Sequence, residues 1–175
     1  MEGALSGKTG FSNDAGYCYV GALERDGRTF IVALLACGWP NNRSYKWSDT
    51  RKLMSYGLEH YQYQNVWQDV LPEKIVVKNG IPESGDLAEQ AYTGLQLAKE
   101  EPDLKLLMAE GEEVEVRVEL PEAVTAPVEP GTVVGSVCYY LNGTAVKAYP
   151  VEAADRAAAV DIRWCFFRAA EKLLL

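Results

Sequence analysis

The sequence predicts an α+β chain of three parts, in which strands and one helix precede an all-β, sandwich-like domain and a final amphipathic helix. β-forming runs flank Asp26 and Gly27, and residues 113–120 alternate between charged and apolar side chains. The formal charge of −8 over 175 residues is also uneven. Residues 1–66 carry 7 basic and 6 acidic groups, residues 67–150 carry 6 and 15, and residues 151–175 carry 4 of each. These three compositions give the predicted domain boundaries.

The first part, residues 1–66, is expected to contain a strand, a hairpin and a helix. The hairpin strands are residues 17–23 and 28–35, because Asp-Gly between them suits a type I′ turn. The second of these strands is apolar almost throughout, which predicts burial on both faces. A helix is expected from Ser48 to Gly57, since glycine often ends a helix at the C′ position.

The second part, residues 67–150, is expected to be a β-domain. Residues 113–120 form a strand with one exposed face. Asn142 and Gly143 mark a second hairpin between two β-forming runs. Residues 86–110 suit either a helix or short strands, and their surroundings favour strands.

The third part, residues 151–175, is helical by composition, and residues 152–175 are expected to be an amphipathic helix. Trp164 and two adjacent phenylalanines beside cations are typical of a helix that lies in a membrane interface. Packing against its own β-domain or in a dimer is an equal alternative from the residues alone. One face gathers Ile162, Phe166, Ala170, Leu173 and Leu174, and the opposite face gathers Asp161, Arg168 and Lys172.

Several classes of protein are excluded by composition. No run of about 18 uncharged apolar residues could span a bilayer as a helix. The acidic balance argues against a protein that binds nucleic acid through its phosphates. Four cysteines without C-x-x-C spacing and a single histidine, His60, give no credible zinc site. The first residues also lack the basic and apolar regions of a signal peptide.

One short motif, Lys8-Thr9-Gly10, has chemistry that the rest of the chain lacks. On an edge strand, an ammonium and a hydroxyl can hold a carboxylate by charge-assisted hydrogen bonds. Glycine lets the backbone come close to a reacting centre. For three letters alone, the simpler interpretation is a solvated lysine in a β-turn. The strand that enters a hairpin gives the motif more weight.

The motifs together resemble the serine-type D-alanyl-D-alanine carboxypeptidases, the low-molecular-mass penicillin-binding proteins or DD-peptidases. The resemblance covers nearly the whole chain. It implies that residues 1–66 are the C-terminal strands and helix of a serine β-lactamase/transpeptidase-like domain, followed by a β-rich domain and a membrane-anchor-like helix. The matching segments are residues 6–12, 15–18, 25–28, 48–57, 126–131 and 133–135.

The resemblance also implies roles for single residues. Lys8 and Thr9 would engage the terminal carboxylate of a stem peptide that ends in D-Ala-D-Ala, or of a β-lactam, beside Gly10. The backbone N–H of Phe11 would be one donor of an oxyanion hole. A third carboxylate contact, usually arginine in this family, falls on Lys46, with Arg43 nearby. Lysine cannot make arginine's bidentate fork, so which of the two takes this contact stays open.

Two elements of the family are missing from the sequence. No serine is followed by lysine three residues later, and no Ser-x-Asn occurs. Both are expected upstream of Met1, so this chain contains no catalytic residue and is expected to be inactive alone. Residues 1–57 are then expected to leave sheet edges and apolar faces exposed.

The resemblance implies an enzyme that removes the last D-Ala from peptidoglycan stem pentapeptides through an acyl-enzyme, without metal or cofactor. It would lie at the extracytoplasmic face of the bacterial cell membrane, held peripherally by residues 152–175. Its expected partners are the stem peptide, β-lactams and the membrane surface, and not nucleic acid. The alternative is a non-catalytic, membrane-associated β-domain that acts as a spacer or interaction module.

Overall fold

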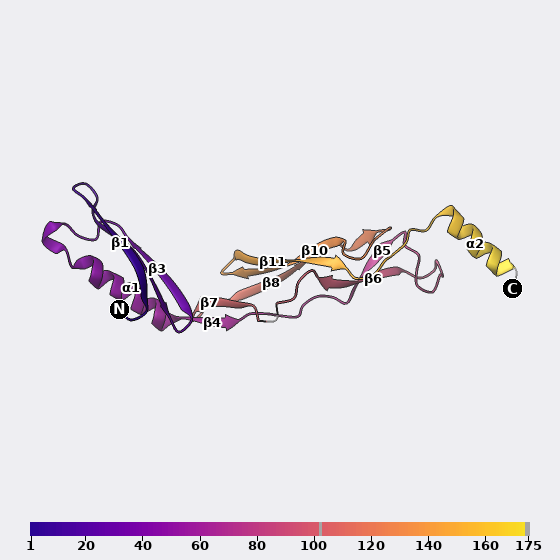
Figure 1. Ribbon diagram of the computed structural model, residues 1–175. Coiled ribbons are helices and arrows are strands. Elements are labelled where there is room, and N and C mark those ends of the chain that lie inside the picture. Colours follow the sequence, from indigo (N-terminus) through magenta and orange to yellow (C-terminus); the bar gives the residue numbers. More distant parts are fainter. Residues whose placement is uncertain (102, 174–175) are drawn as a thin grey trace. The chain divides into compact units, whose positions relative to one another are not determined.

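The computed structural model describes residues 1–101 and 103–173, which are mostly β with two α-helices (Figure 1). The chain divides into two compact units. The chain leaves the first unit after Val66, and residues 103–112 belong to the first unit again. Unit 1 comprises residues 1–66 and 103–112, and unit 2 comprises residues 67–102 and 113–175.

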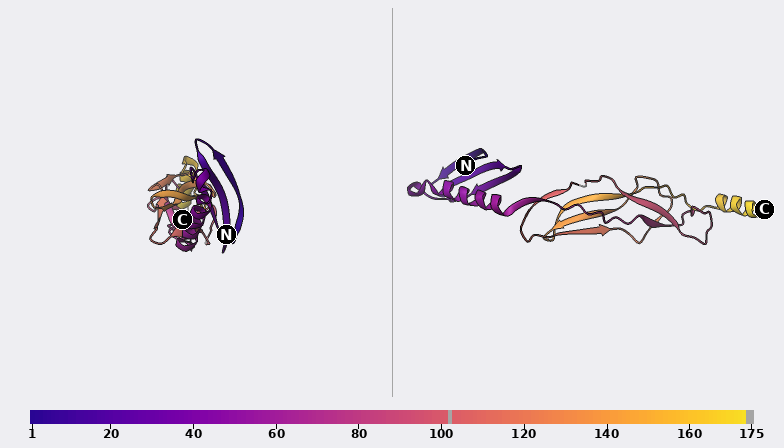
Figure 2. Two further views of the ribbon diagram at one scale, coloured as in Figure 1. Left: turned by 90° about the vertical axis from the view of Figure 1, so that its left-hand side faces the viewer. Right: turned by 90° about the horizontal axis from the view of Figure 1, so that it is seen from below.

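Unit 1 contains a three-stranded antiparallel sheet in the order β1-β2-β3. The helix α1 lies along one face of this sheet (Figures 1 and 2). The strand β1 is at an edge of the sheet, and a separate antiparallel pair joins β4 to β7. The elements of unit 1 are β1 (Ala4–Ser12), β2 (Gly16–Arg25), β3 (Arg28–Leu34), the 3₁₀ turn η1 (Pro40–Asn42), α1 (Tyr45–His60), β4 (Tyr61–Asn65) and β7 (Lys105–Ala109).

The first predicted hairpin is confirmed. Asp26 and Gly27 have φ angles of 54° and 72°, as a type I′ turn requires. After the turn, the guanidinium of Arg28 donates hydrogen bonds to the carbonyls of Leu58 and Tyr61, at 2.8 and 2.7 Å. Such bonds satisfy backbone acceptors at the end of a helix, so Arg28 ties the end of α1 to the sheet.

The predicted helix has different ends from those observed. It begins at Tyr45 and continues to His60, so Gly57 lies inside it and not at its C′ position. A Cβ atom at Gly57 would come 2.9 Å from the ring of Phe30. The glycine is therefore explained by close packing of α1 on β3, since any side chain there would displace the ring.

The prediction that β3 is buried on both faces is wrong for this chain. Leu23, Val32 and Met54 form a small buried core between the sheet and α1. On the other face, Ile31 is 75% exposed, and Leu35, just beyond the strand, is 81% exposed. Only the face toward α1 is covered by described residues, which agrees with the expectation of exposed apolar faces.

Unit 2 contains one six-stranded sheet in the order β8-β10-β11-β6-β5-β9. Only β5 and β9 run parallel, and the other neighbours are antiparallel. The β-rich character of residues 67–150 is as predicted. These six strands are hydrogen-bonded into one sheet, whereas a sandwich was expected. The strands are β5 (Lys74–Lys78), β6 (Ala91–Leu97), β8 (Val114–Glu119), β9 (Ala123–Thr125), β10 (Val133–Leu141) and β11 (Thr144–Ala153).

The second predicted hairpin is confirmed. Asn142 and Gly143 join β10 to β11 with φ angles of 49° and 78°. The ambiguous residues 86–110 contain the strands β6 and β7, which confirms the choice of strands over a helix.

Two clusters hold unit 2 together. One is an apolar core that joins strands and loops distant in sequence, and the other is a cluster of aromatic rings. The rings of Trp67, Tyr139 and Tyr149 have centroids 5.6 to 6.3 Å apart. Tyr139 is fully buried. The apolar core consists of Val77, Ala91, Val128, Ala153 and Ala157.

The C-terminal helix α2 (Ile162–Leu173) begins ten residues later than predicted. Ala153 ends β11 and is fully buried, and Ala157 bridges to Val128. Residues 151–161 therefore complete the β-unit instead of starting the helix. Neither described helix is long and apolar enough to cross a membrane. Leu174, which the predicted apolar face includes, lies outside the described residues, as do the side chains of Lys172 and Leu173.

Candidate functional site

The free edge of β1 is the strongest candidate site. The hydrogen bonds of Tyr17 show which way the backbone of β2 points. Its N–H donates to the carbonyl of Gly38, and its carbonyl accepts from the N–H of Cys37, both at 2.7 Å. The backbone groups of Tyr17 are therefore directed away from β1. Because direction alternates along an antiparallel strand, those of Tyr19 are too.

This alternation fixes the backbone of β1 as well. Phe11 lies opposite Tyr17, and Thr9 lies opposite Tyr19. Both members of a non-hydrogen-bonded pair turn their N–H and C=O groups away from each other. The N–H groups of Thr9 and Phe11 therefore point out of the free edge. A ligand in extended conformation can bind there as an added strand.

The side chains of the K-T-G motif divide between the two faces of the sheet. Thr9 lies opposite Tyr19, whose ring packs against Trp47 of α1 at 5.1 Å between centroids. Lys8 lies opposite Val20, which is half exposed on the other face. Thr9 and Phe11 therefore share the face of α1, and Lys8 and Gly10 share the uncovered face. Only the edge itself is accessible from both sides.

The two candidates for a third carboxylate contact differ clearly in their surroundings. Lys46, in the first turn of α1, is half-buried. Its Nζ atom lies 4.4 Å from the ring centroid of Tyr17 and 5.3 Å from that of Trp47. Arg43 is exposed at the end of η1 and makes no hydrogen bond or ion pair with the described residues. Lys46 is thus placed on the same face as Thr9, and Arg43 is not held in place.

Two glycines of β1 have opposite surroundings. A Cβ atom at Gly7 would collide with the side chain of Tyr19. A Cβ atom at Gly10 would meet no atom within 4 Å, and Gly10 does not have a positive φ. Packing of the described residues thus explains Gly7 and does not explain Gly10. The open space at Gly10 is available to a ligand.

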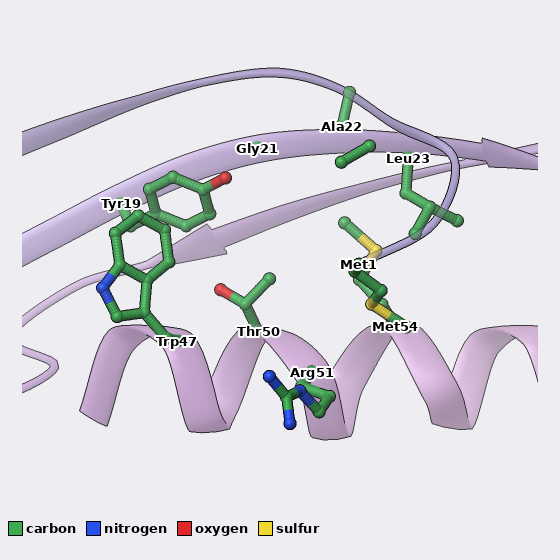
Figure 3. Close-up of a pocket in the computed structure, with 10 residues that line it drawn as sticks. Met1, Tyr19, Gly21, Ala22, Leu23, Trp47, Thr50, Arg51 and Met54 are labelled. Atoms are coloured by element: carbon green, nitrogen blue, oxygen red, sulfur yellow. The ribbon is translucent and has the colours of Figure 1, made fainter. Parts of the chain in front are cut away.

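A cavity of about 290 Å³ lies between α1 and the sheet of unit 1. Figure 3 shows the rings of Tyr19 and Trp47 at one end, and Met1 near Met54 at the other. Thr50 points from the helix toward the sheet, and its Oγ1 is buried without a hydrogen-bond partner in the described part of the chain. The residues that line the cavity include no pair of acid and base, and we assign it no chemistry.

A cluster of charged groups in unit 2 is fully satisfied by its own members. The carboxylate of Glu101 accepts a hydrogen bond from the hydroxyl of Tyr149 at 2.6 Å and pairs with Lys147 at 3.2 Å. It also pairs with Lys99. Hydrogen bonds from Lys99, Tyr149 and Lys147 lower the pKa of Glu101 to about 2. Burial, and then the bond to Glu101, raise the pKa of Tyr149. This cluster fastens the segment around Glu101 to β11, and we assign it no chemistry.

Residues 1–101 and 103–173 contain no group of three or more His, Cys, Asp or Glu side chains that could hold a metal ion. Of the predicted site residues, Thr9 and Phe11 share the face of the sheet on which Lys46 lies, and Lys8 and Gly10 lie on the opposite face. Sequence reasoning missed Tyr17 and Trp47, which place Lys46. The alternation of aromatic residues at positions 17 and 19, opposite the motif, was the available signal.

Comparisons with known proteins agree with the resemblance. Residues 97–157 match the family described as penicillin-binding protein 5, C-terminal domain. The D-alanyl-D-alanine carboxypeptidase DacD from Francisella tularensis is similar with a TM-score of 0.58 and 22% identity, over 91% of this chain and 37% of that one. Penicillin-binding protein 5 from Haemophilus influenzae gives 0.50 and 20%, over 86% and 41%.

A peptidoglycan synthesis regulatory factor (PBP3) from Streptococcus pneumoniae gives a TM-score of 0.52 and 24% identity, over 90% of this chain and 44% of that one. The chain therefore spans less than half of the length of each of these structures. The chain is thus similar in fold to these structures, and residues 97–157 match a C-terminal domain family.

Proposed function

We propose that this chain is the C-terminal part of a serine D-Ala-D-Ala carboxypeptidase and that the free edge of β1 binds the carboxylate end of a peptidoglycan stem peptide. The observation that carries the proposal is the outward direction of the N–H groups of Thr9 and Phe11, on a strand whose face toward α1 also has the Thr9 side chain and Lys46. A β-lactam has a carboxylate at a comparable position and would bind at the same edge.

We assign different roles to the two faces of the edge. The Thr9 hydroxyl and the Lys46 ammonium lie on one face and would hold the carboxylate by charge-assisted hydrogen bonds. The outward N–H of Phe11 would stabilise the oxyanion of a tetrahedral intermediate. Lys8 would reach the reacting bond from the opposite face, where Gly10 leaves open space.

The acyl-transfer step itself is not assigned to any residue of this chain. A serine nucleophile needs a base beside it, and no serine in the 175 residues is followed by lysine three positions later. We therefore propose that the chain contributes binding and electrostatic stabilisation, and that the nucleophile is contributed by other sequence.

The binding proposal is tested by an NMR titration of the 175-residue chain. The ligands are an acetylated tripeptide that ends in D-Ala-D-Ala and its C-terminal amide. We expect the amide signals of Thr9 and Phe11 to shift with the acid and not with the amide. A charged hydrogen bond contributes about 1.5–3 kcal/mol, so Thr9→Val should weaken binding roughly tenfold or more.

Thr29→Val is the matched control, because Thr29 is an exposed threonine on β3 of the same sheet. It should leave binding unchanged. Equal shifts with acid and amide, or shifts outside β1 and the start of α1, would contradict the proposed site.

Peripheral membrane association through α2 is the second part of the proposal. The side of α2 that meets the rest of unit 2 carries Trp164, Phe167 and Arg168. The guanidinium of Arg168 donates to the carbonyls of Ser84 and Gly85 at 3.3 Å. Ile162 is 90% exposed and Phe166 is 69% exposed. An amphipathic helix with its apolar side chains turned outward is suited to a membrane interface, and Arg163 beside Phe167 adds a cation there.

Co-sedimentation with vesicles of phosphatidylethanolamine and phosphatidylglycerol tests this part. Burying a phenylalanine side chain is worth about 1.5–3 kcal/mol, so Phe166→Glu should lower vesicle binding by roughly tenfold or more. Val133→Glu is the matched control, because Val133 is 61% exposed on β10. If both variants bind like the wild type, α2 is not the anchor.

A non-catalytic module remains the second candidate, because unit 2 has its own sheet and core. Labelling with a fluorescent penicillin distinguishes the enzyme from the non-catalytic module, when this chain is compared with the protein encoded together with its neighbouring sequence. A covalent band from this chain alone would show a nucleophile that we have not assigned. The protein encoded with its neighbouring sequence should give such a band only if the enzyme proposal is right.

A further inference from the structure

Lys46 is held by aromatic rings and not by an opposite charge. Its Nζ atom lies 4.4 Å from the ring centroid of Tyr17 and 5.3 Å from that of Trp47. Asp49, one turn further along α1, accepts a hydrogen bond from Ser48 and makes no ion pair with Lys46. In the described part of the chain, the lysine has no salt-bridge partner. Its positive charge is therefore not neutralised.

The ring of Tyr17 is itself fixed from two sides. Its backbone is bonded to Cys37 and Gly38, and its ring packs against Phe11 at 4.7 Å between centroids. Phe11 is its partner across the strands β1 and β2. Trp47 is likewise packed against Tyr19. The ammonium of Lys46 thus contacts rings that are anchored on the sheet.

We propose that Tyr17 is a positioning residue that holds the ammonium of Lys46 on the face of the sheet that Thr9 shares. Lys46, and not Arg43, then binds the ligand carboxylate. This inference rests on the proposed binding of a carboxylate at the β1 edge. A cation over an aromatic face keeps its N–H groups free on the side away from the ring. A lysine side chain otherwise has four rotatable bonds and no preferred direction.

The arrangement also explains how lysine can serve at this position. Arginine would orient itself by forming a two-pronged pair with the carboxylate, which lysine cannot do. Tyr17 and Trp47 fix the lysine before the ligand arrives, so less conformational freedom is lost on binding. Arg43 has no such support, because it is exposed and makes no hydrogen bond or ion pair with the described residues.

Two variants of Tyr17 separate positioning from general packing. Tyr17→Phe keeps the ring, and Tyr17→Leu removes it. We expect Tyr17→Phe to bind the acetylated D-Ala-D-Ala tripeptide like the wild type and Tyr17→Leu to bind it about three- to tenfold more weakly. Affinity for the C-terminal amide should not change. Lys46→Met should lose the preference for the acid, whereas Arg43→Met should keep it.

A second measurement does not depend on the ligand. The ε-CH₂ protons of Lys46 should resonate upfield of lysines that contact no ring, in the wild type and in Tyr17→Phe, because Lys46 contacts the rings of Tyr17 and Trp47. They should move toward ordinary positions in Tyr17→Leu, which removes the nearer of the two rings. If Tyr17→Leu fails to fold, the wild-type shift and the comparison of Lys46→Met with Arg43→Met decide the matter.

The outcomes separate the two proposals. If the wild type does not distinguish acid from amide, the proposed function fails, whatever the position of Lys46. If the wild type does distinguish them, the positioning role is overturned by any of three results. These are unchanged acid binding in Tyr17→Leu, loss of acid preference in Arg43→Met alone, or an ordinary ε-CH₂ shift for Lys46 in the wild type.

Discussion

The side chain of Tyr19 lies across Gly7 on the neighbouring strand, so closely that a Cβ atom at position 7 would collide with its ring and hydroxyl. Gly21 on the same strand as Tyr19 is in the same situation. We expect Gly7→Ala to displace the ring and to destabilise unit 1 by about 1–3 kcal/mol, as overpacking usually does. Urea titration followed by the amide signals of β2 measures this.

Gly10→Ala is the control for Gly7→Ala and tests the open space beside the motif. A Cβ atom at Gly10 meets nothing within 4 Å, so its stability should change by less than about 0.5 kcal/mol. Binding of the D-Ala-D-Ala tripeptide should nevertheless weaken, because the methyl group occupies the space proposed for the ligand. Unchanged binding in Gly10→Ala would show that the ligand does not approach this face.

Thr93 provides a test of the core of unit 2. It is 1% exposed, and its hydroxyl donates to the carbonyl of Asp155 at 2.9 Å and accepts from the N–H of Asp155 at 3.2 Å. Thr93→Val removes the side-chain partner of both backbone groups of Asp155 in a part-buried site. We expect a loss of about 1–3 kcal/mol in the free energy of unfolding of unit 2, with recovery in Thr93→Ser. Equal stability of Thr93→Val and the wild type would contradict this.

The Glu101 cluster predicts a dependence of stability on acidity. The pKa of Glu101 falls from 4.5 to about 2 on folding, chiefly through its bond with Lys99. Between these values the unfolded chain binds more protons, so stability rises with pH in this window. The contribution of Glu101 is complete above about pH 4.5 and disappears as the pH falls toward 2.

Thermal unfolding of the wild type and Glu101→Gln at several pH values measures this contribution. The difference in Tm for unit 2 should be largest near neutral pH and should vanish near pH 2. The neighbouring exposed Glu100→Gln removes the same charge without the contact to Tyr149, so its effect should be small. A pH-independent difference for Glu101→Gln would show that the carboxylate charge is not what matters.

Local signals in the sequence were sufficient for the turns and for most strands. Asp26-Gly27 and Asn142-Gly143 predict their hairpins because the positive φ angles depend on those residues alone. Gly57 was misread because its reason is the ring of Phe30, 27 positions away. The start of α2 was misplaced because residues 153–159 are rich in alanine, which favours helix. An isolated antiparallel bridge between Ala157 and Val128 instead keeps this segment extended.

The candidate site was predictable in its residues but not in its geometry. The motif and its resemblance pointed to Thr9, Phe11 and Lys46. That the N–H of Phe11 points outward depends on the hydrogen bonds of Tyr17 with Cys37 and Gly38. That Lys46 is held depends on a contact between positions 17 and 46. Neither can be obtained from the spacing of residues along the chain.

The side-chain hydrogen bonds that join the described part of α2 to the loop at residues 81–85 come from one guanidinium. Arg168 donates to the carbonyls of Ser84 and Gly85 and pairs with Glu171 at 3.1 Å, and the described α2 side chains are absent from the buried core. We therefore expect Arg168→Met to release α2 while unit 2 keeps its stability within about 0.5 kcal/mol. Amide exchange of α2 should become faster, and the indole signal of half-buried Trp164 should move toward that of exposed tryptophan.

Arg163→Met is the matched control on the same helix, since Arg163 is exposed and bonds to no loop carbonyl among the described residues. It should leave exchange in α2 unchanged. Vesicle binding should survive in Arg168→Met, because the outward Ile162 and Phe166 are untouched. If exchange in α2 stays slow in Arg168→Met, the helix is held by Trp164 and Phe167 against the loop at residues 81–85, and the guanidinium is dispensable.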